Sequence, residues 1–229
     1  MRNSLTAGTA VALLTGAAMW FVGSAGAQGG GTIEAEVKYT GAPVVEKLKV
    51  NKHTEKCGTE ALIEKVAVGG NKGLAYAVVS VPGAKGVTRA KGVIDQRGCK
   101  FNPRVLVMSP GELEIKNSDD ILHNIHTYST ANPSINKAQP KFKKTMTEKF
   151  EKPEVIKVTC DVHSWMLGWV AVVPGPAAVT DSGGVAKVEN VPAGKHKVEV
   201  WHETLGKQEK EVEVKAGQVT KVSFEMKGK

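Results

Sequence analysis

Apolar and polar residues alternate along much of this chain with the period of a β-strand. Every second residue from Ile33 to Tyr39 is apolar and polar residues fall between them, so one face of a strand would be buried. Residues 73–81, GLAYAVVSV, form a more continuous apolar run, which is typical of a buried strand. The first part of the chain is therefore predicted to be β-sheet.

Strand patterns continue through the middle of the chain. Residues 105–120, VLVMSPGELEIKNSDD, read as a strand, a Pro-Gly turn, a second strand and an acidic turn. Two further strands, in residues 154–159 and 168–173, flank a short loop. Helical periodicity is weak and confined to residues 54–63, where it would give one turn or two. Many short strands separated by turns predict an all-β sandwich.

The sequence pattern changes after VVPGP at residues 172–176. The remaining residues show short alternating strands separated by turns such as Asp-Ser-Gly-Gly, Pro-Ala-Gly and Ala-Gly. We interpret this tail as part of a second β module. At about 55 residues, it is small for a sandwich that must bury a core alone.

The amino-terminal residues have the pattern of an export signal. Residues 1–27 hold one basic residue, no acidic residue, a long apolar stretch and a final Ala25-Gly26-Ala27 that fits the small-residue rule for cleavage. The alternative is an uncleaved anchor, because the apolar stretch of about 18 residues just reaches the length that spans a bilayer. We therefore expect a periplasmic or otherwise exported protein of the cell envelope, with peripheral or amino-terminal membrane association left open.

Composition and charge narrow the range of partners. Hydrophobic residues make up 41% of the 229 residues, which suits a globular chain, and the net charge is +8. Residues 137–157 hold seven lysines against three glutamates, which predicts either a solvated strand face or a docking surface for an acidic partner or an anionic membrane. We expect no nucleic-acid partner, because export would separate the chain from it.

Three cysteines in an exported chain leave one without an internal partner. If Cys57 and Cys99 form a disulfide in an oxidising compartment, Cys160 is the free thiol, and it then needs burial or a metal. A disulfide that includes Cys160 is the alternative, because sequence alone does not fix the connectivity. That alternative would abolish the metal chemistry considered next.

Residues 160–166, CDVHSWM, place a thiol, an imidazole and a thioether in one short loop between two strands. These are soft or borderline donors, and a redox-active copper site takes two histidines and one cysteine in a plane with a long axial methionine. A second imidazole would come from a neighbouring strand, and residues 117–126, NSDDILHNIH, supply candidates. Taken singly, a cysteine at a strand end is usually a small buried hydrophobe and a methionine is usually packing. The combination at this spacing favours copper.

These two segments resemble the blue copper proteins, or cupredoxins. Amicyanins in particular use a His-Asn-x-His segment and a short C-x-x-H-x-x-M loop, and this chain has both, at residues 123–126 and 160–166. The resemblance implies that one type 1 copper is bound by four side chains, those of His123, Cys160, His163 and axial Met166. It also implies that Asn124 joins the two ligand loops through hydrogen bonds. Amicyanins have proline on both sides of the late histidine, where this chain has Val162 and Ser164.

The function that this resemblance implies is one-electron transfer between Cu(II) and Cu(I), with no substrate bond made or broken. Four protein ligands leave no open position for a substrate, so we do not expect an enzyme. In the family the late histidine lies near the surface, so His163 would be the electron exit. Trp165 and Leu167 would form an apolar docking patch beside it, with packing of Trp165 inside the sandwich as the alternative. The expected partner is a redox protein such as a cytochrome or a membrane electron-transfer complex.

The flanking segments carry a second resemblance. Residues 180–200, TDSGGVAKVENVPAGKHKVEV, resemble the carboxypeptidase regulatory-like, or transthyretin-like, domain, whose opening strand, Gly-x-Pro turn and further strand match GTIEAEVKYTGAP and GLAYAVVSV upstream. We therefore expect residues 31–90 and 175–229 to form this smaller transthyretin-like or Ig-like β-sandwich. A Greek-key cupredoxin sandwich at residues 91–174 would be inserted between its halves. Two domains in sequence are the alternative.

Two other functions stay open on the sequence. A periplasmic copper carrier would bind Cu(I) mainly through Cys160 and Met166 and exchange it readily. A structural or binding subunit of a membrane redox complex, or a surface protein, would use the regulatory-like domain for contacts and have no redox role. The other four histidines are interpreted as loop or exposed strand residues without a ligand role: His53, His126, His196 and His202.

Overall fold

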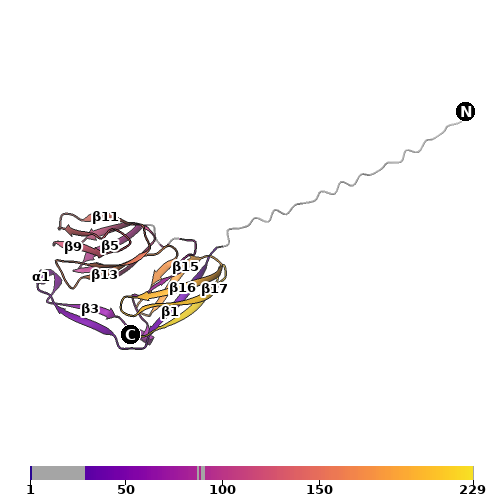
Figure 1. Ribbon diagram of the computed structural model, residues 1–229, viewed down its shortest axis with the longest axis horizontal. Helices are drawn as coiled ribbons and strands as arrows, with labels where there is room; N and C mark the ends of the chain where they lie inside the picture. The colour runs from indigo at the N-terminus through magenta and orange to yellow at the C-terminus, as the bar shows by residue number, and fades with distance from the viewer. Residues whose placement is uncertain (2–28, 87, 89–90, 229) are drawn as a thin grey trace.

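The computed structural model describes residues 1, 29–86, 88 and 91–228, and its regular secondary structure is almost wholly β-strand (Figure 1). Apart from Met1, the expected export signal at residues 1–27 lies outside the described residues. The helices in the described part are α1 (Thr54–Cys57) and the single turn η1 (Gly70–Lys72). Neither of them is long and apolar enough to cross a bilayer.

The middle of the chain forms a pair of packed sheets, which we call the first sandwich. One sheet has the strand order β10 (Asn136–Gln139), β9 (His123–Tyr128), β12 (Glu154–Thr159), β13 (Leu167–Val172) and β7 (Val105–Met108). The other has the order β11 (Thr145–Phe150), β8 (Gly111–Asn117), β5 (Lys91–Arg97) and β6 (Lys100–Asn102). Alternation in β8 buries Leu113 and Ile115, and these residues meet Ile156 and Val170 of the facing sheet in one core.

Strands that precede and strands that follow the first sandwich in the sequence form the second sandwich, although they are far apart along the chain. One of its sheets has the order β15 (Val185–Val191), β1 (Gly31–Tyr39) and β18 (Val219–Met226). The other has the order β14 (Ala177–Val179), β4 (Val78–Ser80), β16 (Gly194–His202) and β17 (Gly206–Val214). The apolar face predicted for residues 33–39 is the buried face of β1. β1 pairs with β15 and, in parallel, with β18, so the first and the last strands of the described residues lie in one sheet.

Residues 44–66 depart from the expected organisation. We expected all of residues 31–90 to belong to the second module, but the structure places most of this segment, the cover hairpin, against the first sandwich, and only its last residue, Val66, packs in the core of the second. Its strands, which pair with each other, are β2 (Val44–Lys49) and β3 (Glu60–Val66). The physical reason is that Val50 and Ile63 find their buried neighbours in the core of the first sandwich. Figure 1 shows α1, the turn within this hairpin, beside the first sandwich and away from β1.

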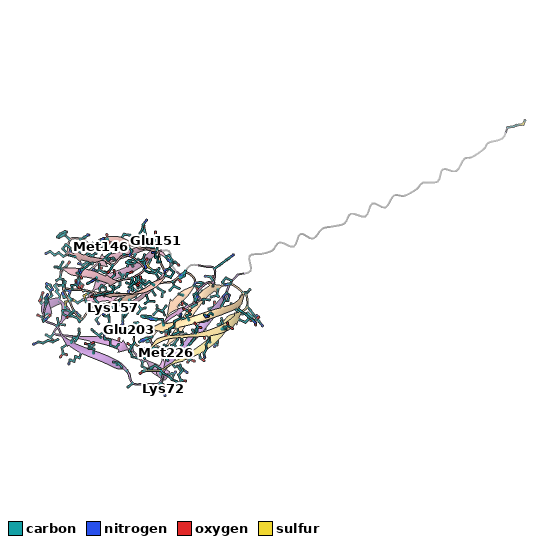
Figure 2. The ribbon with its side chains drawn as sticks, in the orientation of Figure 1. Lys72, Met146, Glu151, Lys157, Glu203 and Met226 are labelled. Carbon is teal, nitrogen blue, oxygen red and sulfur yellow. A yellow bond between two sulfur atoms is a disulfide. The ribbon has the colours of Figure 1, made fainter. Side chains whose placement is uncertain are left out.

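The two sandwiches meet along a buried interface. Apolar residues of β4, β7 and β13 pack together there. Beside them Arg104 forms an ion pair with Glu203, and Glu203 also accepts a hydrogen bond of 2.6 Å from Nε1 of Trp169. Figure 2 shows Glu203 between the two sandwiches. The second sandwich thus supports one edge of the first.

Candidate metal centre

Strand pairing brings the two expected ligand segments to the same end of the first sandwich. β9 begins at His123, and β12 ends at Thr159, one residue before Cys160. The two strands pair antiparallel with Thr159 opposite His126, so the start of β9 lies beside the end of β12. The loop of residues 160–166 then turns back into β13 and stays at this end of the sandwich.

Three of the expected donors converge at this end. Nδ1 of His123 lies 3.0 Å from Nδ1 of His163, which lies 3.7 Å from Sγ of Cys160. The three residues are buried, and their ligand atoms lie within 4.8 Å of one another. Metal–nitrogen and metal–sulfur bonds measure about 2.0 and 2.3 Å, so a single ion can touch both atoms of each pair. Two imidazoles and a thiol are donors that copper prefers, so the residues present fit one copper ion.

Met166 lies in the same loop as two of these donors. The N–H of Met166 donates a hydrogen bond of 2.9 Å to the carbonyl of His163, which closes a tight turn. Its side chain is buried in the core of the first sandwich. The turn therefore keeps the thioether on the buried side of the ligand loop.

The cysteines leave Cys160 as the free thiol. Cys57 and Cys99 form a disulfide with an S–S distance of 2.02 Å, and Cys160 is free and buried. This pairing excludes a disulfide at Cys160 and removes Cys99 as a ligand. Burial raises the pKa of the Cys160 thiol, because the thiolate would lose its contact with water, and a hydrogen bond from the N–H of Asn124 offsets only part of this rise. The thiol is therefore protonated until a metal displaces its proton.

Asn124 joins the two ligand segments. Its Oδ1 accepts a hydrogen bond of 2.9 Å from the N–H of Asp161, and its own N–H donates to Sγ of Cys160 at 3.4 Å. Its Nδ2 donates to Oδ1 of Asn136 on the neighbouring strand. Because Asn124 follows His123 and Asp161 follows Cys160 in sequence, these bonds hold the first histidine beside the thiol.

Asp119 fixes the ring of His123, a role that the sequence analysis did not assign. Its Oδ2 lies 2.8 Å from Nε2 of His123, and the N–H groups of Gly98 and Cys99 donate to the same carboxylate. Burial raises the pKa of Asp119, but the hydrogen bonds from Cys99 and Gly98 outweigh it, so the net shift is downward. An ionised carboxylate can only accept, so Nε2 of His123 carries the hydrogen and Nδ1 directs its lone pair into the site. The acidic turn directly before the strand was the available signal.

His53 is a loop residue outside the donor group, as we interpreted it, but it contacts this site through His163. Its Nδ1 lies 2.9 Å from Nε2 of His163, and the two rings are 5.2 Å apart between centroids. No local pattern connects the two residues, which are 110 positions apart in the chain. The disulfide offered a signal, because Cys57 follows His53 closely and is anchored to the first sandwich through Cys99.

His163 is fully buried, so its ring does not reach the surface, near which the electron exit is expected to lie. Its exposed fraction is 0%, because His53 lies against its Nε2 edge and the ring of Trp165 packs at 5.0 Å from its centroid. Burial, followed by repulsion from any charge on His123, lowers the pKa of His163 to about 4. The ring is therefore neutral at neutral pH, as a metal ligand must be.

The docking patch expected at Trp165 and Leu167 is not an open surface. Trp165 is only 5% exposed and Leu167 is half-buried. Both line a cavity of about 420 Å³ together with Met166, and residues 61–63 of β3 line it from the cover hairpin. Trp165 thus packs inside, because a hairpin that we assigned to the other module lies over this side of the first sandwich.

The remaining histidines lie outside the donor set. His126 is half-buried and contacts the carboxylate of Asp161 at 3.0 Å, and Nε2 of His196 lies 2.7 Å from the carbonyl of Pro192. His202 is 2% exposed, so its interpretation as an exposed strand or loop residue was wrong. Its position in β16 puts it on the same face as the buried valines of that strand.

Comparisons with known proteins return solved structures alone, since no family model and no curated protein matches this chain. A Cu-containing nitrite reductase from Thermus scotoductus SA-01 is 20% identical with a TM-score of 0.33, and the match covers 39% of this chain and 24% of the reductase. A purple cupredoxin from Nitrosopumilus maritimus is 21% identical with a TM-score of 0.31, covering 35% of this chain and 98% of that one. A mutant of amicyanin is 17% identical with a TM-score of 0.32, covering 41% and 97%. Likenesses at such TM-scores carry no argument about this chain, so the function must be inferred from its own donor atoms.

Proposed function

We propose that this chain is an exported blue copper protein that carries single electrons between redox partners of the cell envelope. The observation that supports the proposal is the convergence of Nδ1 of His123, Nδ1 of His163 and Sγ of Cys160 at distances that one ion can bridge. Met166 is the axial ligand in this proposal. Copper held by these residues would supply one-electron chemistry between Cu(II) and Cu(I).

The residues of the chain hold the donors ready for such an ion. Asp119 orients His123, and Asn124 keeps the two ligand segments together. The low pKa of His163 keeps its ring neutral, so Cys160 is the ligand that must lose a proton on binding. Four protein ligands leave no position for a substrate, which favours an electron carrier over an enzyme.

The alternatives have less support. A copper carrier needs ready access to its ion, whereas His163 and Cys160 are buried and the Cys57–Cys99 disulfide ties the cover hairpin down. A purely structural role would leave a buried group of two imidazoles and a thiol without a purpose, and burial of polar groups costs free energy. Electron transfer accounts for both the donors and their enclosure.

The proposed location is the periplasm or another exported compartment. The disulfide supports it, because such bonds persist in oxidising compartments, and so does the signal-like pattern of residues 1–27. A redox protein such as a cytochrome, or a membrane electron-transfer complex, is the proposed partner. In the same proposal the first sandwich is a cupredoxin domain and the second is a transthyretin-like module.

Titration of the mature chain with Cu(II) tests the proposal. One equivalent should produce intense visible absorption from the thiolate–copper bond, and Cys160→Ser should bleach it. His196→Gln, which alters a histidine of the second sandwich, is the control and should keep the colour. Binding without colour, or colour that survives Cys160→Ser, would overturn the proposal. Rapid loss of the ion to a chelator would favour the carrier instead.

A further inference from the structure

We infer that electrons enter and leave the proposed centre through His53, which we call the port, rather than directly through His163. The lysine-bearing tip around His53 binds an acidic redox protein. The inference rests on the proposed function, because it assigns the partner surface of the same site. The tip comprises residues 49–56 of the cover hairpin, which include the first three residues of α1.

His53 is the outermost ring of a row that starts at the donor atoms. One nitrogen of His163, Nδ1, faces His123 and Cys160, and the opposite nitrogen, Nε2, lies 2.9 Å from Nδ1 of His53. His163 is fully buried and His53 is half-buried, so His53 brings the row to the surface. A neutral imidazole can donate or accept at either nitrogen, so this hydrogen bond persists when a metal at Nδ1 of His163 requires a hydrogen at Nε2.

The backbone holds His53 in this place through an uncommon conformation. Its φ of 49° and ψ of 43° are left-handed, which is rare outside glycine and persists only where the surroundings enforce it. His53 is the N-cap residue of α1, yet its side chain makes no capping hydrogen bond. It contacts His163 instead. The carbonyl of His53 accepts a hydrogen bond from the N–H of Cys57, and Cys57 is bonded to Cys99. The port is thereby fixed to the same sandwich as the ligands.

The other side of the ligand loop is closed to a partner. Trp165 and Leu167 line the cavity beneath β3, and Leu62 on that strand is 61% exposed. A protein that approaches from this side therefore meets the outer face of the hairpin before it meets the loop. The His53 contact reaches His163 without such an intervening strand.

The surface around His53 is basic. The tip has three exposed lysines, Lys49, Lys52 and Lys56, against one acidic residue, Glu55. The other lysines of the hairpin, Lys47 and Lys65, form ion pairs with glutamates of the same hairpin, which leaves the positive charge concentrated at the tip. Opposite charge steers the encounter of proteins and sets their orientation. An acidic face on the redox partner therefore fits this surface.

Electron transfer through His53 leaves the chemistry of the rings unchanged. The copper centre is oxidised by one electron, from Cu(I) to Cu(II), and the oxidised centre of the acidic partner is reduced by that electron. His163 and His53 keep their protons, and no bond forms or breaks. In the reverse transfer, a reduced acidic partner gives one electron to the centre, and Cu(II) is reduced to Cu(I).

The first test uses the copper-loaded mature chain and two small oxidants, anionic hexacyanoferrate(III) and cationic tris(phenanthroline)cobalt(III). Changing Lys49, Lys52 and Lys56 to Glu together should slow oxidation by the anion about tenfold at low ionic strength and speed oxidation by the cation. The matched control changes three exposed lysines of the second sandwich to Glu: Lys195, Lys215 and Lys227. It should leave the preference between the two oxidants in place.

Two substitutions of His53 distinguish a residue that conducts electrons from one that only shields His163 from solvent. His53→Leu keeps side-chain bulk over His163 but removes the imidazole contact, so it should slow both oxidants severalfold. His53→Ala uncovers His163 and should restore much of the rate. A measurement without copper accompanies them, because diethyl pyrocarbonate should modify His163 of the metal-free chain in His53→Ala but not in the wild type, as read by peptide mass.

The outcomes distinguish the port from the function on which it rests. If the copper colour is intact but His53→Leu and the lysine reversal leave both rates unchanged, the port is overturned and the proposed function stands. Modification of His163 in the wild-type chain would also overturn the port, since His163 would then reach solvent itself. A colourless chain would overturn the proposed function and the port together. The lysine reversal leaves His53 intact, so it decides the partner surface even if substitutions at His53 disturb folding.

Discussion

Both sandwiches bury histidines, but among the described residues only those of the first sandwich, His123 and His163, lie within a group of donor atoms. His163, in the first sandwich, has the donor atoms of His123 and Cys160 beside its ring. His202, in the second, accepts a hydrogen bond at Nδ1 from the N–H of Thr204. Burial lowers the pKa of both rings to about 4. A shifted pKa thus reports burial in both sandwiches, and the convergence of donors is what marks a metal centre.

The buried polar residues near His163 and near His202 also differ. Beside the ligands, the first sandwich buries a polar network in which Nε2 of Gln96 donates to Oε1 of Gln139 at 2.7 Å, and Nδ2 of Asn117 donates to the carbonyls of Gln139 and Ile121. The second sandwich buries a mainly apolar core in which Thr180 is hydrogen-bonded to Ala77 and Leu74, and His202 there precedes Glu203 of the buried ion pair. Buried polar groups destabilise a fold unless they are hydrogen-bonded. Their concentration beside the donors indicates an end of the sandwich that holds its loops rigidly.

The largest expected difference between the two sandwiches is in copper colour. His123→Gln and His163→Gln should each abolish the visible absorption of the chain with one equivalent of Cu(II), because each removes a nitrogen ligand. His202→Gln should retain it. If His202→Gln bleached the colour, the second sandwich would be tied to the centre and the contrast between the two histidines would fail.

The next largest effect is expected from the ion pair that joins the two sandwiches. Arg104→Ala leaves the buried carboxylate of Glu203 without its cation and should lower the free energy of unfolding by about 3–5 kcal/mol. Arg97→Ala, which breaks a pair at a largely exposed arginine, is the control and should cost about 1 kcal/mol or less. Urea denaturation measures both. Equal effects would mean that the interface does not depend on the buried pair.

Acid should destabilise the metal-free chain through its buried histidines. An unfolded histidine binds a proton below pH 6.5 or so, whereas His202 in the folded chain does so only near its pKa of about 4, so protons favour the unfolded state between these values. The stability is fully present above the unfolded pKa and is lost as the pH falls. His202→Gln should remove a contribution of the order of 3 kcal/mol from the difference between neutral and acidic pH. Urea denaturation of both proteins at pH 7 and at pH 4 would detect it, and identical pH profiles would contradict it.

The smallest expected effect concerns the carboxylate that orients a ligand. Asp119→Asn weakens the hold on Nε2 of His123 and should lower copper affinity about 10- to 100-fold while the colour remains. Competition with a chelator measures the affinity. Asp181→Asn, in a turn of the second sandwich, is the control and should leave the affinity unchanged. Unchanged affinity in Asp119→Asn would show that His123 is held by its packing alone.

The donors were accessible to sequence reasoning because Cys160, His163 and Met166 share one loop between two strands of recognisable pattern. The contact of His53 with His163 was not accessible, because it depends on which core accepts Val50 and Ile63 of the cover hairpin, and no period along the chain records that choice. The burial of His163 and Trp165 has this same origin, since His53 and β3 of the hairpin lie against them.

The burial of His202 could have been predicted from the strand period. Val198, Val200 and His202 alternate with partly exposed residues along β16 and lie on its buried face. We interpreted the histidine from the polar residues near it in sequence rather than from its phase along the strand. Phase is the better guide here, because successive side chains of a strand point to opposite faces.

The position of β1 between β15 and β18 sets an order for assembly. During synthesis from the amino terminus, β1 emerges early, and both of its sheet neighbours emerge only after the whole first sandwich. Until then both edges of β1 are unpaired, and an unpaired strand edge can pair wrongly with another chain. Slow completion of the carboxyl-terminal strands would therefore lower solubility even when the first sandwich has already folded correctly.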